Sequence, residues 1–381
     1  MIILEQLKFI QSKQLGKTMK KKVGIIGGGI FGISCALNLD KTHDVTLFEQ
    51  TSDIMSGATY ANHNRHHLGY HYPRSPETAQ QCLESREEFE TIYRTCCVSN
   101  FANYYCIAKE NSKTSAKDYI LFCDHVGLKY KEEWPAEGLV NRSKIELSLK
   151  TKEGVYDFTK FKNLVEDRIK KTSTLKIKLN HRVLSGSIKA GGEKNLITQN
   201  ETTHNAHTFD FIINAMYANH NQFCEWFGFK KRSFQFNLQE LCVIELPLKE
   251  TIGITIQDGP FPSFIPLGFS KNRCLFAHVE ASQLVRSVSQ SNERLLSRVL
   301  NVKSNWHNIR EISAIYIPLL KKSNYINSIF SDRIVDASRK DTDARITETT
   351  SHGYGCWSVF ASKIITCEST AKKLAAEIRT Y

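Results

Sequence analysis

The sequence predicts an α/β protein in which a Rossmann-like nucleotide-binding domain is interleaved with an α+β domain built on an antiparallel sheet. Two observations support this fold class. The apolar run Val23–Ile26 leads into Gly27, Gly29 and Gly32, an order typical of the strand, tight turn and helix of a βαβ unit. Farther along, residues 234–280 alternate short strand patterns with turns, which favours an antiparallel sheet.

The opening βαβ unit has the features of a dinucleotide-binding site. Gly27 allows a tight turn, Gly29 allows a pyrophosphate to approach the backbone, and Gly32 allows the helix Ile30–Leu39 to pack closely on the sheet. The second strand ends at Glu49, whose carboxylate can accept hydrogen bonds from a ribose diol and would repel a 2′-phosphate. Because the unit is complete, a chance glycine-rich turn is the much weaker interpretation.

The remainder of the chain favours FAD over NAD as the dinucleotide. Enzymes of this fold that reduce a flavin with a nicotinamide carry a second glycine fingerprint in mid-chain, and residues 190–193 follow no strand-to-helix pattern that fits one. Disulfide reductases place two nearby cysteines after the first helix, whereas Cys35 stands alone inside that helix. We therefore expect bound FAD that takes electrons directly from a small substrate.

The later elements follow one another without a simple domain boundary or an internal repeat. We expect helices over residues 75–95, 115–126, 142–149, 159–171, 290–299 and 361–380. We expect strands over residues 101–109, 175–179, 182–188, 209–215, 241–246, 253–257, 264–267, 274–279 and 310–319. This order predicts an N-terminal extension of residues 1–18, a discontinuous, glutathione-reductase-like FAD-binding domain of residues 19–100, 153–233 and 325–381, and a substrate or lid domain of residues 101–152 and 234–324.

Composition narrows the class of protein. A chain of 381 residues, 41% hydrophobic and 24% charged, is long enough for two packed cores and argues against disorder. It has no run of 18 apolar residues, so no spanning helix is predicted, while association with the inner face of a membrane stays open. Residues 1–17 do not resemble a signal peptide, and we therefore expect the eleven cysteines to be reduced thiols of a cytoplasmic protein. Cys96 and Cys97 are expected to point apart.

The net charge of +12 allows three interpretations. It could steer an anionic substrate, it could hold RNA or acidic lipid, or it could be a solvated lysine-rich surface. Lysines are spread over the whole chain, and no segment combines arginines with exposed aromatic residues as a nucleic-acid module would. Nucleic acid is therefore the disfavoured partner, and a small molecule the favoured one.

Four segments resemble the FAD-dependent oxidoreductases of the D-amino acid oxidase family, which includes glycine and sarcosine oxidases, glycerol-3-phosphate dehydrogenases and L-2-hydroxyglutarate dehydrogenase. They are the opening βαβ unit, residues 56–73 with the pattern His-x-Gly-x-x-Tyr, the strand 209–215, and the glycine-rich segment 353–366. Residues from about 101 to 152 and much of 238–324 depart from the family, so the identity of the substrate does not carry over.

The resemblance implies a set of cofactor-binding residues. The segment 353–366 is expected to form a glycine-rich turn and the start of the final helix, closing over the isoalloxazine ring. Its backbone amides would stabilise negative charge on the reduced flavin, with help from Lys363; a surface cation is an equally weighted interpretation of Lys363. The full expected set is Gly27, Gly29, Ile30, Phe31, Gly32, Glu49, Gln50, Ser56, Ala58, Thr59, Val183, Ala215, Gly353, Gly355, Trp357, Ser358 and Val359.

Candidate catalytic residues come from the histidine-rich loop. Oxidising a carbinol or an amine needs a group that takes a proton near neutral pH, and His67 of the His-x-Gly-x-x-Tyr pattern is the first candidate, with His66 second. A purely structural role has even weight for either. His63, His66, His67 and His71 could also hold a metal, which is disfavoured because no carboxylate accompanies them; covalent attachment of FAD through His63 or His66 is a minor alternative.

Substrate recognition is expected from an arginine and several hydroxyls. Arg345 could clamp a carboxylate or phosphate with its guanidinium fork, and Tyr72, Tyr316 and Tyr354 could supply pocket hydroxyls. The predicted function is an FAD-dependent oxidoreductase that dehydrogenates a small anionic amino acid, amine or 2-hydroxy acid by hydride transfer to flavin N5, with oxygen or a quinone as electron acceptor. The alternatives are an FAD-dependent RNA-modifying enzyme and a non-catalytic flavin-binding subunit.

Overall fold

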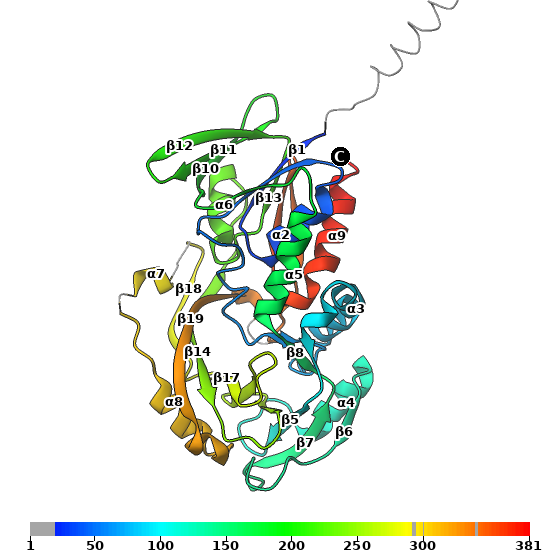
Figure 1. Ribbon diagram of the computed structural model, residues 1–381, viewed down its shortest axis with the longest axis vertical. Helices are drawn as coiled ribbons and strands as arrows, with labels where there is room; N and C mark the ends of the chain where they lie inside the picture. Colours follow the sequence, from blue (N-terminus) through cyan, green and yellow to red (C-terminus); the bar gives the residue numbers. More distant parts are fainter. Residues whose placement is uncertain (1–19, 292–294, 300, 340–341) are drawn as a thin grey trace, which may run out of the picture.

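The computed structural model describes residues 20–291, 295–299, 301–339 and 342–381. The expected N-terminal extension of residues 1–18 lies outside the described residues. Two large sheets organise the described chain, one near each end of the molecule's long axis (Figure 1).

The first large sheet has six strands in the order β20-β21-β13-β1-β2-β9, parallel except for the β20–β21 hairpin. Its strands are β1 (Lys22–Ile26), β2 (Asp44–Phe48), β9 (Lys176–Lys178), β13 (Phe211–Asn214), β20 (Glu348–Gly353) and β21 (Cys356–Phe360). Buried valines, isoleucines and leucines fill both faces of the central strands, as expected for a parallel sheet covered on both sides.

Helices and a smaller sheet cover this parallel sheet. On one face lie α2 (Ile30–Leu39), α3 (Pro76–Tyr93), α5 (Phe158–Lys170) and α9 (Cys367–Ile378), whose apolar residues share one core with the strands (Figure 1). On the other face lie α6 (His220–Phe227) and the antiparallel strands β10 (Arg182–Ile188), β11 (Lys194–Asn200) and β12 (Thr203–Phe209).

The second large sheet has nine strands and is mostly antiparallel, with β5 and β15 as a parallel pair. Its strands are β5 (Ala102–Ala108), β6 (Tyr130–Glu132), β7 (Ile145–Thr151), β14 (Phe234–Glu245), β15 (Ile252–Gln257), β16 (Pro262–Pro266), β17 (Arg273–His278), β18 (Gln283–Ser289) and β19 (Asn324–Asp336). The helices α4 (Ala116–Val126), α7 (Leu295–Arg298) and α8 (Trp306–Ser313) flank it (Figure 1).

A third, short sheet joins the two parts. It contains β3 (Arg65–His66), β8 (Gly154–Tyr156) and β4 (Cys97–Val98), with β8 in the middle. The chain therefore passes through this sheet each time it moves between the parallel sheet and β5 or β7. This arrangement places the histidine-rich loop at the junction.

Most predicted elements are confirmed, and three are wrong. Residues 145–151 form strand β7 rather than a helix, because Ile145, Leu147 and Leu149 alternate with polar residues at a period of two. Residues 310–319 are not a strand: the chain there forms the end of α8 and the 3₁₀ turn Pro318–Lys322. Residues 356–360 form strand β21 rather than the start of the last helix.

The predicted domain boundary at residue 324 also changes. Strand β19 pairs with β14 along its whole length, from Phe234 opposite Asp336 to Glu245 opposite Asn324. It therefore belongs to the nine-stranded sheet, and the chain returns to the parallel sheet only after Asp336. The sequence prediction separated β19 from the nine-stranded sheet because the pairing of β19 with β14 cannot be seen in the sequence.

The structure also tests the expectations about the cysteines and about membrane-spanning helices. All eleven cysteines are free thiols, and ten are buried. Cys96 and Cys97 do not point apart, because both sulfur atoms lie against the carbonyl oxygen of Tyr93, at 3.0 and 3.5 Å. Among the described residues, no helix is long and apolar enough to cross a membrane.

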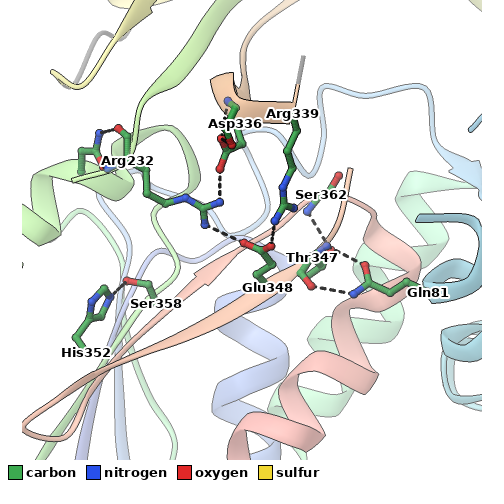
Figure 2. A network of polar contacts seen from close by, with 11 residues as sticks. Gln81, Arg232, Asp336, Arg339, Thr347, Glu348, His352, Ser358 and Ser362 are labelled. Atoms are coloured by element: carbon green, nitrogen blue, oxygen red, sulfur yellow. Dashed lines mark hydrogen bonds and ion pairs between the residues drawn. The ribbon is translucent and has the colours of Figure 1, made fainter. Parts of the chain in front are cut away.

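Charged side chains fix the crossing from β19 to β20. Arg232, just before β14, pairs with Asp336 at the end of β19 and, at 3.0 Å, with Glu348 at the start of β20 (Figure 2). Arg339 pairs with the other oxygen of the same glutamate. Both ends of the crossing are thereby held against the segment that leads into β14.

A buried carboxylate connects the helices on the first face of the parallel sheet. Glu368 of α9 accepts hydrogen bonds from Ser34 of α2 at 2.9 Å, from Tyr93 of α3 at 2.8 Å and from Arg168 of α5 at 2.6 Å. Its side chain is only 5% exposed. Removing it would leave buried donors on three helices without an acceptor.

We therefore expect Glu368→Ala to lower the free energy of unfolding by about 3 kcal/mol, because unpaired buried donors and a half-buried guanidinium remain. Equilibrium urea unfolding measures this change. Glu87→Ala, at an exposed position of α3, is the control and should stay within about 0.5 kcal/mol of the wild type. Equal stability of the two variants would contradict a stabilising role for Glu368.

Candidate functional site

A cavity of about 790 Å³ lies at the carboxyl edge of the parallel sheet, where β1, β2, β13 and β21 end. Its wall comes from the loops that follow these strands, the histidine-rich loop and strand β19 of the nine-stranded sheet, with further residues from the start of β10, from α6 and from α7. In doubly wound folds ligands bind at this edge of the sheet. The cavity is therefore the candidate site.

The β1–α2 turn forms one end of the cavity. Gly27 has a φ of +110°, and a Cβ at this residue would lie 2.6 Å from the carbonyl oxygen of Ala215. A Cβ at Gly32 would lie 2.0 Å from the carbonyl oxygen of Gly27. Gly29 caps α2, whose first turn has no acidic residue, so its amide groups and helix dipole favour an anion there.

Glu49 stands at the end of β2 beside this turn. Its Oε2 accepts a hydrogen bond from the amide of Gly28 at 2.7 Å, and its Oε1 accepts one from the amide of Thr51 at 2.9 Å. The carboxylate is held in place and lines the cavity. A turn that only glycine can occupy, an open helix N-terminus and a fixed acid fit the diphosphate and the ribose of a dinucleotide.

The other end of the cavity is formed by the histidine-rich loop. Arg65 and His67 line it, whereas His66 faces away, with its ring stacked on Phe89 at 5.7 Å and its Nε2 3.6 Å from Glu90. Successive residues of an extended strand point to opposite sides, which explains this alternation. The prediction of His66 as a second catalytic candidate is therefore wrong.

His67 is largely buried, and its surroundings favour the neutral form of the imidazole. Burial lowers the pKa of His67 well below its ordinary value, and the positive charges of Lys363, His71, Arg65 and His63 lower it further. Its Nδ1 is buried and has no hydrogen-bond partner. A neutral imidazole that faces a cavity can accept a proton.

Lys363 lines the cavity from the loop after β21, and its Nζ lies 4.4 Å above the ring of Tyr72. Burial, followed by the charge of Arg65, lowers its pKa to about 7. The amides of Ser362 and Lys363 donate to the hydroxyl of Thr347 at 3.1 and 3.5 Å, and Thr347 is bonded twice to Gln81 (Figure 2). The loop that carries Lys363 is thereby held against α3.

Arg333 is a third cation of the cavity wall, supplied by β19. Among the described residues, no carboxylate lies within ion-pair distance of Arg333 or Lys363, whereas Arg65 has Glu153 at 3.8 Å. A buried cation without a partner is costly unless an anion binds to it. Arg333 and Lys363 therefore indicate an anionic ligand.

The seventeen expected cofactor residues divide into three groups, of which the last, Gly353, Gly355, Trp357 and Ser358, does not line the cavity. Gly32 allows the packing of α2 on the turn. Twelve others line the cavity: Gly27, Gly29, Ile30, Phe31, Glu49, Gln50, Ser56, Ala58, Thr59, Val183, Ala215 and Val359.

The glycine-rich segment is misplaced by the sequence prediction. Gly353 and Gly355 form the turn of the β20–β21 hairpin, at the end of β21 remote from the cavity, and a Cβ at Gly355 would meet Phe211 and Lys194. Trp357 and Ser358 lie within the sheet, where the indole of Trp357 donates to Glu377 at 2.8 Å. None of these four residues lines the cavity; residues 361–364 do so instead.

The expected substrate residues also need correction. Arg345 pairs with Asp343 at 2.5 Å and does not line the cavity. Tyr316 packs on Phe261 in the core of the nine-stranded sheet, and Tyr354 is 73% exposed on the β20–β21 turn. Tyr72 is buried beside His67, under Lys363, and does not form part of the wall itself.

Sequence reasoning missed Arg333, a cavity residue that comes from a distant strand. Arg333 lies in a segment that was expected to belong to the FAD-binding domain, and its neighbours in sequence carry no motif. Of the histidines, His63 and His67 line the cavity. Among the described residues, no group of three or more histidine, cysteine or acidic side chains is placed to hold a metal ion.

The fold and the cavity together define a class of protein: a dinucleotide-binding protein whose cradle opens towards an antiparallel sheet. The sequence model of one family, FAD dependent oxidoreductase (DAO), matches residues 22–223. The chain therefore belongs to the DAO family of FAD-dependent oxidoreductases, as the sequence resemblance indicated, and FAD is its cofactor.

Two solved structures share the fold, and one curated protein matches part of the chain. Glycine oxidase from Geobacillus kaustophilus has the same fold, with a TM-score of 0.73, 13% identity and 94% of each chain covered. L-α-glycerophosphate oxidase from Mycoplasma pneumoniae, whose structure has FAD bound, gives a TM-score of 0.69 with 16% identity and 95% of each chain covered. The FAD-dependent monooxygenase kojA of Aspergillus flavus is 41% identical over 85 residues, which are 22% of this chain and only 20% of that protein.

The turn at Gly27 generates a prediction about cofactor binding. Gly27→Ala should lower FAD occupancy at least about tenfold, because a Cβ would force the turn away from Ala215 at a cost above about 1.4 kcal/mol. Visible flavin absorbance relative to protein absorbance measures the occupancy. Gly191→Ala, in the β10–β11 turn where a Cβ meets nothing within 4 Å, should retain the colour. Full flavin content in both variants would show that the turn tolerates displacement.

Proposed function

We propose that this enzyme dehydrogenates a small polar substrate that carries an anionic group, such as an amino acid, an amine that bears an acidic group, or a 2-hydroxy acid, at a C–N or C–O bond. The observation that supports the proposal is the composition of one cavity. It joins the dinucleotide cradle to a neutral histidine, His67, and to two cations without carboxylate partners, Arg333 and Lys363, within the described chain. Glycine and glycerophosphate, named for two proteins of the same fold, are likewise small and carry an anionic group.

Different residues of the cavity have different roles in the proposed reaction. Bound FAD supplies the oxidant, since its isoalloxazine accepts a hydride from the carbon that is oxidised. Arg333 and Lys363 bind the anionic group and orient the substrate. His67 takes the proton from the substrate nitrogen or oxygen, which its low pKa allows because the imidazole is neutral before the reaction. Ile329, Phe330 and Val359 provide apolar wall that excludes water.

His67 is the first residue to test. His67→Gln should leave FAD bound but slow anaerobic bleaching of the flavin by substrate about a hundredfold or more, because the proton acceptor is lost. Stopped-flow absorbance in the absence of oxygen measures the rate. His66→Gln is the matched control: its ring faces α3, and the rate should change less than about threefold. A wild-type rate in His67→Gln would remove the assignment.

Lys363 generates a pH-dependent prediction. The ammonium form holds an anion, and with a pKa of about 7 this form predominates below that pH and is lost above it. The value of kcat/KM for an anionic substrate should therefore fall as pH rises through about 7. Lys363→Met should raise KM about tenfold or more and abolish this alkaline decrease. A decrease that persists unchanged in Lys363→Met would assign it to another group.

A substrate screen tests the function as a whole. Anaerobic incubation with amino acids, amines, hydroxy acids and sugar phosphates should identify a compound that bleaches the flavin. Reoxidation of the bleached protein by oxygen or by a quinone then identifies the electron acceptor. Salt-sensitive binding of tRNA without bleaching by any of these compounds would instead favour the RNA-modifying alternative.

A further inference from the structure

Glu153 is a buried acid that the sequence motifs do not mark. It occupies the turn between β7 and β8, and its side chain is fully inaccessible to solvent. Burial raises the pKa of the Glu153 carboxyl, and the charge of Arg65 and the hydrogen bonds from Tyr105 and Leu68 oppose this rise. An ionised carboxylate in such a place is retained only when several donors surround it. Glu153 has such donors: the amide of Leu68, in the loop that carries His67, and the hydroxyl of Tyr105.

The carboxylate of Glu153 fixes the backbone of that loop. Its Oε2 accepts a hydrogen bond from the amide of Leu68 at 2.8 Å. Its Oε1 accepts the hydroxyl of Tyr105, from β5. These bonds hold the residues immediately after His67 against the short central sheet.

The same carboxylate faces the side chain of His67. The Oε1 atom lies 3.7 Å from His67 Nδ1 and 3.8 Å from Arg65 Nη1. His67 Nδ1 is buried and makes no hydrogen bond, so the acid is the acceptor that its N–H can use. Catalytic hydrogen bonds are often this long before substrate binds.

The charges around His67 make this acid important for proton transfer. Lys363, His71, Arg65 and His63 surround the ring, and each opposes a positive charge on it. Glu153 is the carboxylate within ion-pair distance of His67 in the described chain. An imidazolium would form in this setting only with a compensating negative charge.

We propose that Glu153 is a positioning residue for proton transfer: it keeps the Nδ1–H tautomer of His67, leaves Nε2 free to accept the substrate proton, and stabilises the resulting imidazolium. This inference rests on the proposed role of His67. It adds a residue of the β7–β8 turn that contacts the Nδ1 side of His67, acts on proton transfer through His67 and does not touch the substrate.

The first test observes the tautomer without catalysis. The ¹⁵N chemical shifts of histidine ring nitrogens in the FAD-loaded protein distinguish the two tautomers, and the signal absent from His67→Gln assigns His67. Wild type should show Nδ1–H. Glu153→Gln should shift His67 towards Nε2–H, because the amide can present its N–H₂ group to Nδ1. Tyr105→Phe, which removes a donor to the same carboxylate but leaves its charge, should keep the wild-type tautomer.

The second test is a double-mutant cycle on anaerobic flavin bleaching. Glu153→Gln should slow bleaching at least about tenfold in the wild-type background but less than about twofold in the His67→Gln background, because the two residues act as one unit. Glu153→Asp, which keeps the charge, should retain the tautomer and lose less activity. The flavin content of each variant reports whether the fold is intact.

The outcomes separate the two proposals. If His67→Gln bleaches at the wild-type rate, the proposed role of His67 fails. If His67→Gln is slow but Glu153→Gln keeps both the tautomer and the rate, the inference about Glu153 is overturned. It is also overturned if Glu153→Asp and Glu153→Gln show the same tautomer shift and the same loss, since that result indicates a purely structural role.

Discussion

The close approach of helix α2 to the end of strand β1 is the constraint on which this structure depends. A Cβ at Gly32 would lie 2.0 Å from the carbonyl oxygen of Gly27, so the helix can begin directly at the edge of the parallel sheet only with glycine there. This approach aims the N-terminus of α2 into the cavity and leaves room for a diphosphate. The strands that end beside it then supply Glu49, Ala215 and Val359 to the same cavity wall.

Burial of positive charge is the second organising feature. Arg65, Arg333 and Lys363 all line the cavity, and Glu153 lies within ion-pair distance of Arg65 alone among these three. The two cations without carboxylate partners, Arg333 and Lys363, raise the free energy of the folded protein, and bound anionic groups lower it again. Burial, followed by the charges of these cations, lowers the pKa values of His63, His67 and His71 well below the ordinary value, so the histidines stay neutral. The charges that attract an anion therefore also oppose a proton on His67, which makes a nearby carboxylate important.

The cavity also depends on contacts between the two large sheets. Strand β19 belongs to the antiparallel sheet yet places Arg333 beside the loops of the parallel sheet, and the hydroxyl of Ser331 donates to the carbonyl oxygen of Ala61 at 3.3 Å. The ion pairs of Arg232 hold both ends of the crossing that follows this strand (Figure 2). The geometry of the site is therefore a property of the whole chain.

The sequence by itself determined the dinucleotide cradle, the cofactor and the family, because these depend on local features: a buried strand, glycines at a fixed spacing, and an acid at the end of the next strand. It also placed His67 in the cavity through a short motif. Only the tertiary structure decided that Gly353 and Gly355 lie far from the cavity, that Arg345 is already paired, and that Arg333 and Glu153 surround the site. Arg345 pairs with Asp343, two residues before it, and lies outside the cavity wall. The positions of the other residues depend on how distant segments of the chain pack and pair, which fixes the direction of each side chain and leaves no pattern among sequence neighbours.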